Sequence, residues 1–265
     1  MKDRGRIFLF IGVLCMGSAK LHAQHNHVEI ARQNMPAVVT VNVLQKDGET
    51  FSGTGFIAAE NGVIVTSRHM LDDALYINIT FPNAITSGEA RILAQHPQID
   101  LAVLQIAARH LPTVTLGDER TVQPGETITV IGNPRRLQNT VTSGLVSQIR
   151  SQKDGSVWLQ ISAPISPSSS GSPVFDRRGK VIGMAFASFT GEGNQNLNFA
   201  LSVSEIKKIL DQAQIALPAA NEMPVQNSFL RHIQKSWQIT KRLLLQWYNA
   251  WFTSRQHAVT NEGTL

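Results

Sequence analysis

One serine of this chain lies in a setting that suits a nucleophile. Ser170 falls within a run of small residues, 168–172, directly before the apolar residues 173–175. A turn of small residues lets a carbonyl carbon approach the hydroxyl, and its backbone N–H groups can point at the oxyanion that forms. Serine-rich turns are also ordinary loop material, so the evidence for catalysis must come from other segments.

A histidine and an aspartate upstream are candidates for the other two groups of such a site. His69 follows the apolar segment 63–66, and Asp100 precedes the apolar segment 101–104. In nucleophilic catalysis an imidazole takes the hydroxyl proton, while a carboxylate holds the imidazole tautomer and stabilises the imidazolium. The chain order histidine, aspartate, serine matches one known solution of this geometry.

Other residues of the same types leave the assignment open. Asp72 and Asp73 follow the candidate histidine closely and compete with Asp100 as its partner, whereas His96 and His110 compete for the role of base. Each group also has an ordinary interpretation, as a packed histidine, a turn-capping aspartate or a loop serine. The choice therefore depends on the elements that position these residues.

Short strands are predicted over most of the chain between residues 37 and 201. The candidates are rich in Val, Ile and Thr, and Gly, Asn, Asp or Pro separate them. They cover residues 37–44, 55–58, 63–66, 75–81, 90–94, 101–106, 127–131, 141–149, 157–161, 173–175, 181–186 and 198–201. Many short strands without long intervening helices favour barrels or sandwiches. Two helices are expected, over residues 28–34 and from the N-cap Ser202 to about residue 213.

The first residues have the pattern of a secretory signal peptide. A basic start precedes the apolar stretch 7–19, which is too short to span a bilayer, and Ala23 is a small residue suited to cleavage. We therefore expect residues 1–23 to direct export, either to a bacterial periplasm or otherwise out of the cytoplasm. The single cysteine, Cys15, lies inside this segment, so the mature chain would have no disulfide, thiol nucleophile or cysteine zinc site.

The charge and the aromatic residues are unevenly distributed. The net charge is +5, but the excess of basic residues lies in segments 1–23 and 223–265, and the region between them is close to neutral. This distribution excludes a nucleic-acid site in the folded part. Residues 226–257 combine basic and aromatic residues at near-helical spacing, which fits an amphipathic helix on a membrane surface, a self-association helix, or a helix packed on the barrels.

Several segments together resemble the trypsin-like serine peptidases of the HtrA/Deg branch. They are residues 35–39, 53–57, 65–69, 99–103, 131–134 with 140–144, and 165–173. The resemblance implies an all-β fold of two perpendicular six-stranded antiparallel β-barrels with the active site between them, followed by a C-terminal helix and the basic aromatic tail. It carries over His69 as the base, Asp100 as its orienting partner and Ser170 as the nucleophile. It also implies an oxyanion hole formed by the backbone N–H groups of Ser168 and Ser170.

Two departures from the family pattern accompany this resemblance. Ser168 stands where the family usually has glycine, and a residue with a Cβ resists a positive φ. A lost oxyanion donor would cost about 10²–10³ in turnover. The peptide-binding PDZ module of the family is also not expected after residue 212. The expected organisation is a signal peptide (1–23), an N-terminal barrel (24–113), a C-terminal barrel (114–217), and a linker with an amphipathic helical tail (218–265).

Substrate binding in this fold usually adds a peptide strand beside a barrel edge. The matching edge here is expected at Phe186, Ala187 and Ser188. The expected pocket walls, residues 163–168 and 198–201, contain no acidic residue, so we predict a small or medium apolar residue before the cleaved bond. No cofactor is expected, and no metal site either.

These observations predict an exported serine endopeptidase that cleaves protein or peptide substrates through an acyl-enzyme. The alternative is a catalytically weak or inactive binding module on a peptidase fold. A third interpretation is a membrane-surface or assembly protein that acts through residues 226–257.

Overall fold

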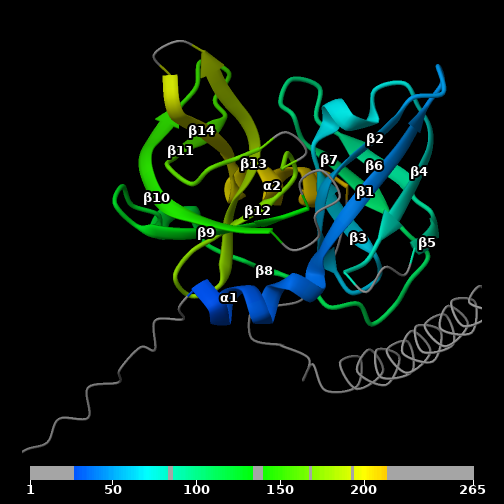
Figure 1. Cartoon of the computed structure of the whole chain (residues 1–265), viewed down its shortest axis with the longest axis horizontal. Coiled ribbons are helices and arrows are strands. Elements are labelled where there is room, and N and C mark those ends of the chain that lie inside the picture. The colour runs from blue at the N-terminus through cyan, green and yellow to red at the C-terminus, as the bar shows by residue number, and fades with distance from the viewer. Residues whose placement is uncertain (1–26, 83–85, 134–139, 167–168, 192–193, 214–265) are drawn as a thin grey trace, which may run out of the picture.

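The structure is a computed structural model of the chain, and it describes residues 27–82, 86–133, 140–166, 169–191 and 194–213. Two β-sheets lie side by side, with the helix α2 (Val203–Gln212) between them and the helix α1 (His27–Asn34) at one end (Figure 1). The predicted signal peptide, residues 1–23, and the predicted tail helix, residues 226–257, lie outside the described residues.

The first sheet closes into a barrel by bending one of its segments. In the described chain it contains β1 (Val38–Gln45), β2 (Thr50–Ala59), β3 (Val63–Thr66), β4 (Ala74–Thr80), β5 (Thr86–Glu89), β6 (Arg91–Gln95) and β7 (Ala102–Gln105), in the order β5-β4-β1-β2-β3-β7-β6. Only Ala90 separates β5 from β6, and its N–H donates to the carbonyl of Ile77 at 2.8 Å. The chain thus passes from pairing with β4 to pairing with β7, which joins the two ends of the sheet.

The second sheet closes through a direct pairing of strands. It contains β8 (Thr115–Leu116), β9 (Thr127–Gly132), β10 (Thr140–Ser151), β11 (Val157–Ile161), β12 (Pro173–Phe175), β13 (Lys180–Gly191) and β14 (Asn194–Ser202). Among the described strands the order is β12-β9-β10-β11-β14-β13-β8, and an additional pairing between β12 and β13 closes a ring. The short β8 adds in parallel to the start of β13.

The all-β fold of two antiparallel barrels is confirmed. Each predicted strand corresponds to an observed one, and the described part of the chain adds β5 and β8. These two strands were not predicted because the residues of β5, Thr-Ser-Gly-Glu, show no apolar alternation and β8 has only two residues. Strand β13 also runs past the predicted end at residue 186 to Gly191, so the hairpin with β14 is longer than expected.

The two helices predicted within the described residues are confirmed, and their caps explain where they begin and end. Pro36 ends α1 and opens a short 3₁₀ helix, η1 (Met35–Ala37). Ser202 caps α2, with its hydroxyl accepting the N–H of Ser204 at 3.4 Å. None of the described helices is long and apolar enough to cross a membrane.

Helix α2 connects the barrels. Its apolar face, with Ile206 and Ile209 buried, packs against β13 and β14 of the second barrel and reaches β7 of the first. A buried cluster runs without interruption from Phe56 in the first barrel to Phe175 in the second. Because interiors pack closely, this continuity fixes the seam between the barrels, where the candidate catalytic residues lie.

Candidate active site

A short helical turn carries His69 at the end of β3. The 3₁₀ helix η2 (Arg68–Leu71) begins two residues after that strand. The Arg68 guanidinium donates to the carbonyl oxygens of His96 at 3.0 Å and Pro97 at 2.7 Å, which ties η2 to the loop before β7. The ring Nδ1 of His96 accepts the backbone N–H groups of Gln98 and Ile99. His96, a rival for the role of base, is therefore used to shape the loop that presents the aspartate.

His69 and Asp100 form a two-point contact. The backbone N–H of His69 donates to Oδ1 of Asp100 at 2.8 Å, and the ring Nδ1 lies 2.7 Å from Oδ2. A carboxylate only accepts hydrogen bonds, so Nδ1 carries the proton and Nε2 has the free lone pair of the neutral ring. Asp73 instead pairs with Lys46 at 3.1 Å. Asp72 acts on His69 only through its charge. Of the three candidate partners, the structure thus brings Asp100 into hydrogen-bond contact with His69.

This contact shifts both groups toward their charged forms. The hydrogen bond that His69 donates to Asp100 raises the pKa of His69 above its usual 6.5, against the opposing effect of burial. Burial would raise the pKa of Asp100, but the hydrogen bonds from the side chain and backbone of His69 outweigh it and lower that pKa. The pair can therefore stabilise an imidazolium, which is what a proton-accepting histidine becomes.

Ser170 lies in a turn that both barrels hold. The N–H of Thr54 in β2 donates to the Ser170 carbonyl at 3.2 Å, and the N–H of Gly171 donates to the carbonyl of Ala185 in β13 at 2.8 Å. The Ser170 hydroxyl is 3.5 Å from the carbonyl oxygen of Phe186. Within the described residues no hydrogen bond joins Ser170 to His69, and the Ser170 N–H has no acceptor. Ser168, the other predicted oxyanion donor, lies outside the described residues.

Thr54 is the central residue of the seam, and sequence reasoning missed its role. It is fully buried, its hydroxyl accepts the N–H of Asn133 at 2.9 Å, and its carbonyl accepts the hydroxyl of Thr66 at 2.7 Å. With the bond to the Ser170 carbonyl, Thr54 joins β9, the end of β3 and the nucleophile turn. The sequence signals were its place in the segment 53–57 of the family resemblance and its position between Gly53 and Gly55, which marks close approach of other backbone.

The turn bearing Ser170 also lies against the turn bearing His69. A Cβ placed on Gly53 would overlap the thioether of Met70 and would lie 3.6 Å from the Ser170 carbonyl oxygen. A Cβ on Gly171 would lie 3.0 Å from the hydroxyl of Thr66, the last residue of β3. The structure therefore brings the surroundings of the candidate base and the candidate nucleophile together at the seam.

The predicted substrate edge falls on a bulge in β13. The pairing of β13 with β14 shifts register between Ala185 and Ala187, which leaves Phe186 as the extra residue. Beyond it Ala187 pairs with Phe199 and Ser188 pairs with Asn198, and in the described sheet no strand pairs with the opposite side of this stretch. The ring of Phe186 packs edge-on against Trp158, with centroids 4.9 Å apart.

Gly171 gives a direct test of this tight seam. Its φ is +89°, and an added Cβ would overlap the carbonyl oxygen of Thr54, so Gly171→Ala combines left-handed strain with a backbone clash. We expect it to lower the free energy of unfolding by about 3–5 kcal/mol in urea titrations. Gly155→Ala is the matched control, because its φ is +80° with nothing within 4 Å. A loss at Gly171 no greater than at Gly155 would contradict the packing described for the seam.

The described residues offer no metal-binding cluster of three or more His, Cys, Asp or Glu side chains. His27, at the start of α1, has its Nδ1 2.7 Å from the hydroxyl of Thr129 in β9. The groups assembled at the seam are instead an imidazole, a carboxylate and a hydroxyl, which suit nucleophilic acyl transfer.

Comparison with known proteins agrees with this arrangement. Residues 53–184 match the family model of the trypsin-like peptidase domain. A probable periplasmic serine endoprotease of the DegP-like kind from Chlamydia muridarum is 38% identical over 165 residues, which is 60% of this chain and 33% of that protein. The chain thus spans a third of the length of this curated relative.

Solved structures show the same likeness. The serine endoprotease from Yersinia pestis aligns with a TM-score of 0.63 and 30% identity, covering 71% of this chain and 66% of the other. The HtrA-type protease AlgW with a tripeptide aligns with a TM-score of 0.66 and 26% identity, covering 71% of this chain and 63% of the other. The double barrel, the family match and these relatives agree, and the chain belongs to the trypsin-like peptidases with similarity to their HtrA-type branch.

Proposed function

We propose that this protein is an exported serine endopeptidase that cleaves polypeptides through an acyl-enzyme. The carrying observation is the two-point contact of His69 with Asp100, at 2.7 and 2.8 Å, beside the turn that bears Ser170. The likeness to HtrA-type proteases supports the same assignment. In this proposal Ser170 is the nucleophile, His69 the base and Asp100 its orienting partner.

In the acylation step the Ser170 oxygen attacks the carbonyl carbon of the substrate peptide bond. Nε2 of His69 takes the hydroxyl proton, and the carbonyl oxygen becomes an oxyanion. The backbone N–H groups of Ser170 and Ser168 are proposed to donate to that oxyanion. The tetrahedral species then collapses, the C–N bond breaks, and the imidazolium returns its proton to the leaving amine.

Water completes the cycle by the same route in reverse. His69 removes a proton from water, the hydroxyl attacks the acyl carbon, and the ester bond to Ser170 breaks as its oxygen regains the proton. Asp100 remains ionised throughout and stabilises the imidazolium in both steps. The lowered pKa of Asp100 suits this role.

The serine must turn before it reacts. Its hydroxyl now lies 3.5 Å from the Phe186 carbonyl, at the upper limit of a hydrogen bond. So long a contact is weak, and rotation about the Cα–Cβ bond into another staggered position can redirect the hydroxyl toward Nε2 of His69. We propose that substrate binding on the adjacent edge of β13, at Phe186, Ala187 and Ser188, accompanies this rotation.

Export rests on the amino-terminal sequence together with the relatives. Several of these are named as periplasmic proteases, and residues 1–23 have the composition of a signal peptide. We propose that the mature protein begins near residue 24 and acts outside the cytoplasm.

Labelling with a serine-reactive fluorophosphonate tests the assignment directly. The probe reacts only when a base and an oxyanion site activate the hydroxyl, so we expect stoichiometric labelling at Ser170 and none in Ser170→Ala. Ser172→Ala is the matched control, because its hydroxyl is fully buried and without a hydrogen-bond partner among the described residues. Persistent absence of labelling in the unaltered protein would instead favour a binding module on a peptidase fold.

A further inference from the structure

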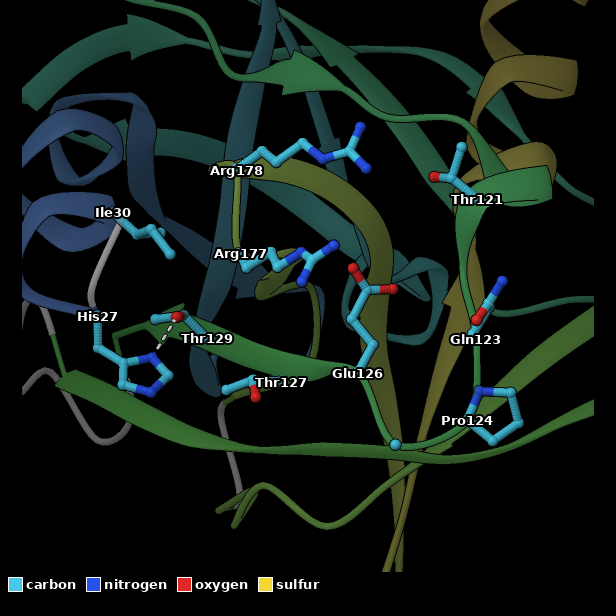
Figure 2. Close-up of a pocket in the computed structure, with 11 residues that line it drawn as sticks. His27, Ile30, Thr121, Gln123, Pro124, Glu126, Thr127, Thr129, Arg177 and Arg178 are labelled. Atoms are coloured by element: carbon cyan, nitrogen blue, oxygen red, sulfur yellow. Dashed lines mark hydrogen bonds between the residues drawn. The ribbon is translucent and has the colours of Figure 1, made fainter. Parts of the chain in front are cut away.

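A groove of about 910 Å³ lies on the second barrel (Figure 2). Its walls come from α1, the segment before β9, β9 itself, and the turn between β12 and β13. The lining includes His27, Ile30, Gln123, Glu126, Arg177 and Arg178. Strand β12 begins three residues after Ser170 and ends directly before the turn, so the groove is at the opposite end of β12 from the candidate nucleophile.

The turn holds its two arginines on a fixed backbone. Asp176 is buried, and its Oδ1 accepts the N–H groups of Arg178 at 2.8 Å and Lys180 at 2.9 Å. Gly179 supplies the positive φ, +72°, that the turn requires, and its N–H donates to the Asp176 carbonyl at 3.0 Å. The Asp176 carboxylate thus hydrogen-bonds the backbone of the turn and leaves both guanidiniums available for another acceptor.

Both guanidiniums extend across the groove toward the segment that carries Thr121 and Glu126 (Figure 2). Among the described residues neither Arg177 nor Arg178 forms an ion pair or a side-chain hydrogen bond. Guanidinium groups present planar pairs of donors that match the two oxygens of a carboxylate. The groove therefore has donors in place for an anionic group.

The charge balance favours one carboxylate over a dianion. Among the Arg, Lys, Asp and Glu side chains of the lining, Arg177 and Arg178 are positive and Glu126 is negative, which leaves a single net positive charge. A phosphate dianion would meet the repulsion of Glu126 without a second unmatched cation. Gln123 adds a neutral amide, and Ile30 adds apolar surface, which suits the backbone and side chains of a peptide.

We propose that this groove is a polypeptide-binding site that recognises an Asp or Glu side chain through Arg177 and Arg178. Binding there needs no nucleophile, so the inference goes beyond the proposed cleavage and is tested apart from it. A segment seated in the groove contacts β9 and the β12–β13 turn, and a protein substrate held there keeps its remaining chain near the barrels.

The test uses the full chain with Ser170→Ala, so that no cleavage occurs during the measurement. An unstructured Gly/Ser peptide with one central Glu, blocked at both ends to remove the terminal charges, is compared with its Gln counterpart by NMR titration. We expect the Glu peptide to bind about five- to tenfold more tightly, as charge-assisted hydrogen bonds on a partly solvated surface provide. Adding both Arg177→Gln and Arg178→Gln to the Ser170→Ala protein should remove the preference for the Glu peptide.

The control pair is Arg91→Gln with Arg109→Gln, which removes the same charge from a separate groove on the first barrel. It should leave the preference for Glu intact. Equal affinity for the two peptides, or a preference that survives loss of Arg177 and Arg178, would overturn the proposal. Tighter binding of inorganic phosphate than of the Glu peptide would also overturn it, since the groove would then serve another class of anion.

Discussion

Replacing Ser170 with alanine should lower the rate of cleavage of an unfolded test protein by about 10⁵–10⁶, since loss of a triad nucleophile removes the acyl-enzyme route. The fold should be unaffected, because among the described residues the hydroxyl makes only the 3.5 Å contact with the Phe186 carbonyl. The measurement is kcat from product formation under saturating substrate, with urea unfolding curves to compare stability. Equal rates for the altered and unaltered proteins would end the assignment of Ser170.

The neighbouring serine separates a chemical effect from a disturbance of the turn. Ser172 is fully buried, and among the described residues its hydroxyl has no hydrogen-bond partner. Ser172→Ala should therefore change kcat by no more than a few-fold. A loss at Ser172 as large as at Ser170 would show that the turn, and not the nucleophile, accounts for the result.

The barrels were predictable because their strands follow local rules. Segments such as β3 and β11 are short apolar runs bounded by turn residues, and that pattern is visible in the sequence. Closure of each barrel was not visible in it. The bend at Ala90 and the pairing of β12 with β13 depend on contacts between segments distant along the chain. Such contacts leave little local trace in composition or periodicity.

The candidate site, like the barrels, could be predicted only in part from the sequence. His69, Asp100 and Ser170 could be named from residue type, position and family resemblance, but the sequence left Asp72 and Asp73 as rivals for the aspartate. The choice of Asp100 depends on Arg68, which bonds the carbonyls of His96 and Pro97 and brings that loop to η2. A side chain that positions backbone has no fixed spacing from its partners in the sequence, so no sequence motif predicts its role. Thr54 was missed for the same reason.

The contact between His69 and Asp100 also sets how stability varies with pH. The raised pKa of His69 contributes stability that is complete below about pH 6.5 and is lost as the pH rises through the folded pKa. The lowered pKa of Asp100 contributes stability that is complete above about pH 3.8 and is lost as the pH falls through its folded pKa. Both contributions are present between these values, where the unaltered protein should most exceed Asp100→Asn in the free energy of unfolding.

Asp100→Asn should lower kcat by about 10⁴, because an amide can stabilise the wrong imidazole tautomer and carries no negative charge to stabilise an imidazolium.

The pH dependence of kcat/KM should change as well. His69 must be neutral to accept a proton, so kcat/KM of the unaltered protein should rise with pH through a value above 6.5, the usual pKa that Asp100 raises. Without the carboxylate that inflection should move to lower pH. Asp72→Asn is the control, because Asp72 is exposed and acts on His69 only through its charge. Two results would show that Asp100 does not orient the base. One is an unchanged inflection in the pH profile of kcat/KM for Asp100→Asn, and the other is a decrease in kcat for Asp72→Asn as large as that for Asp100→Asn.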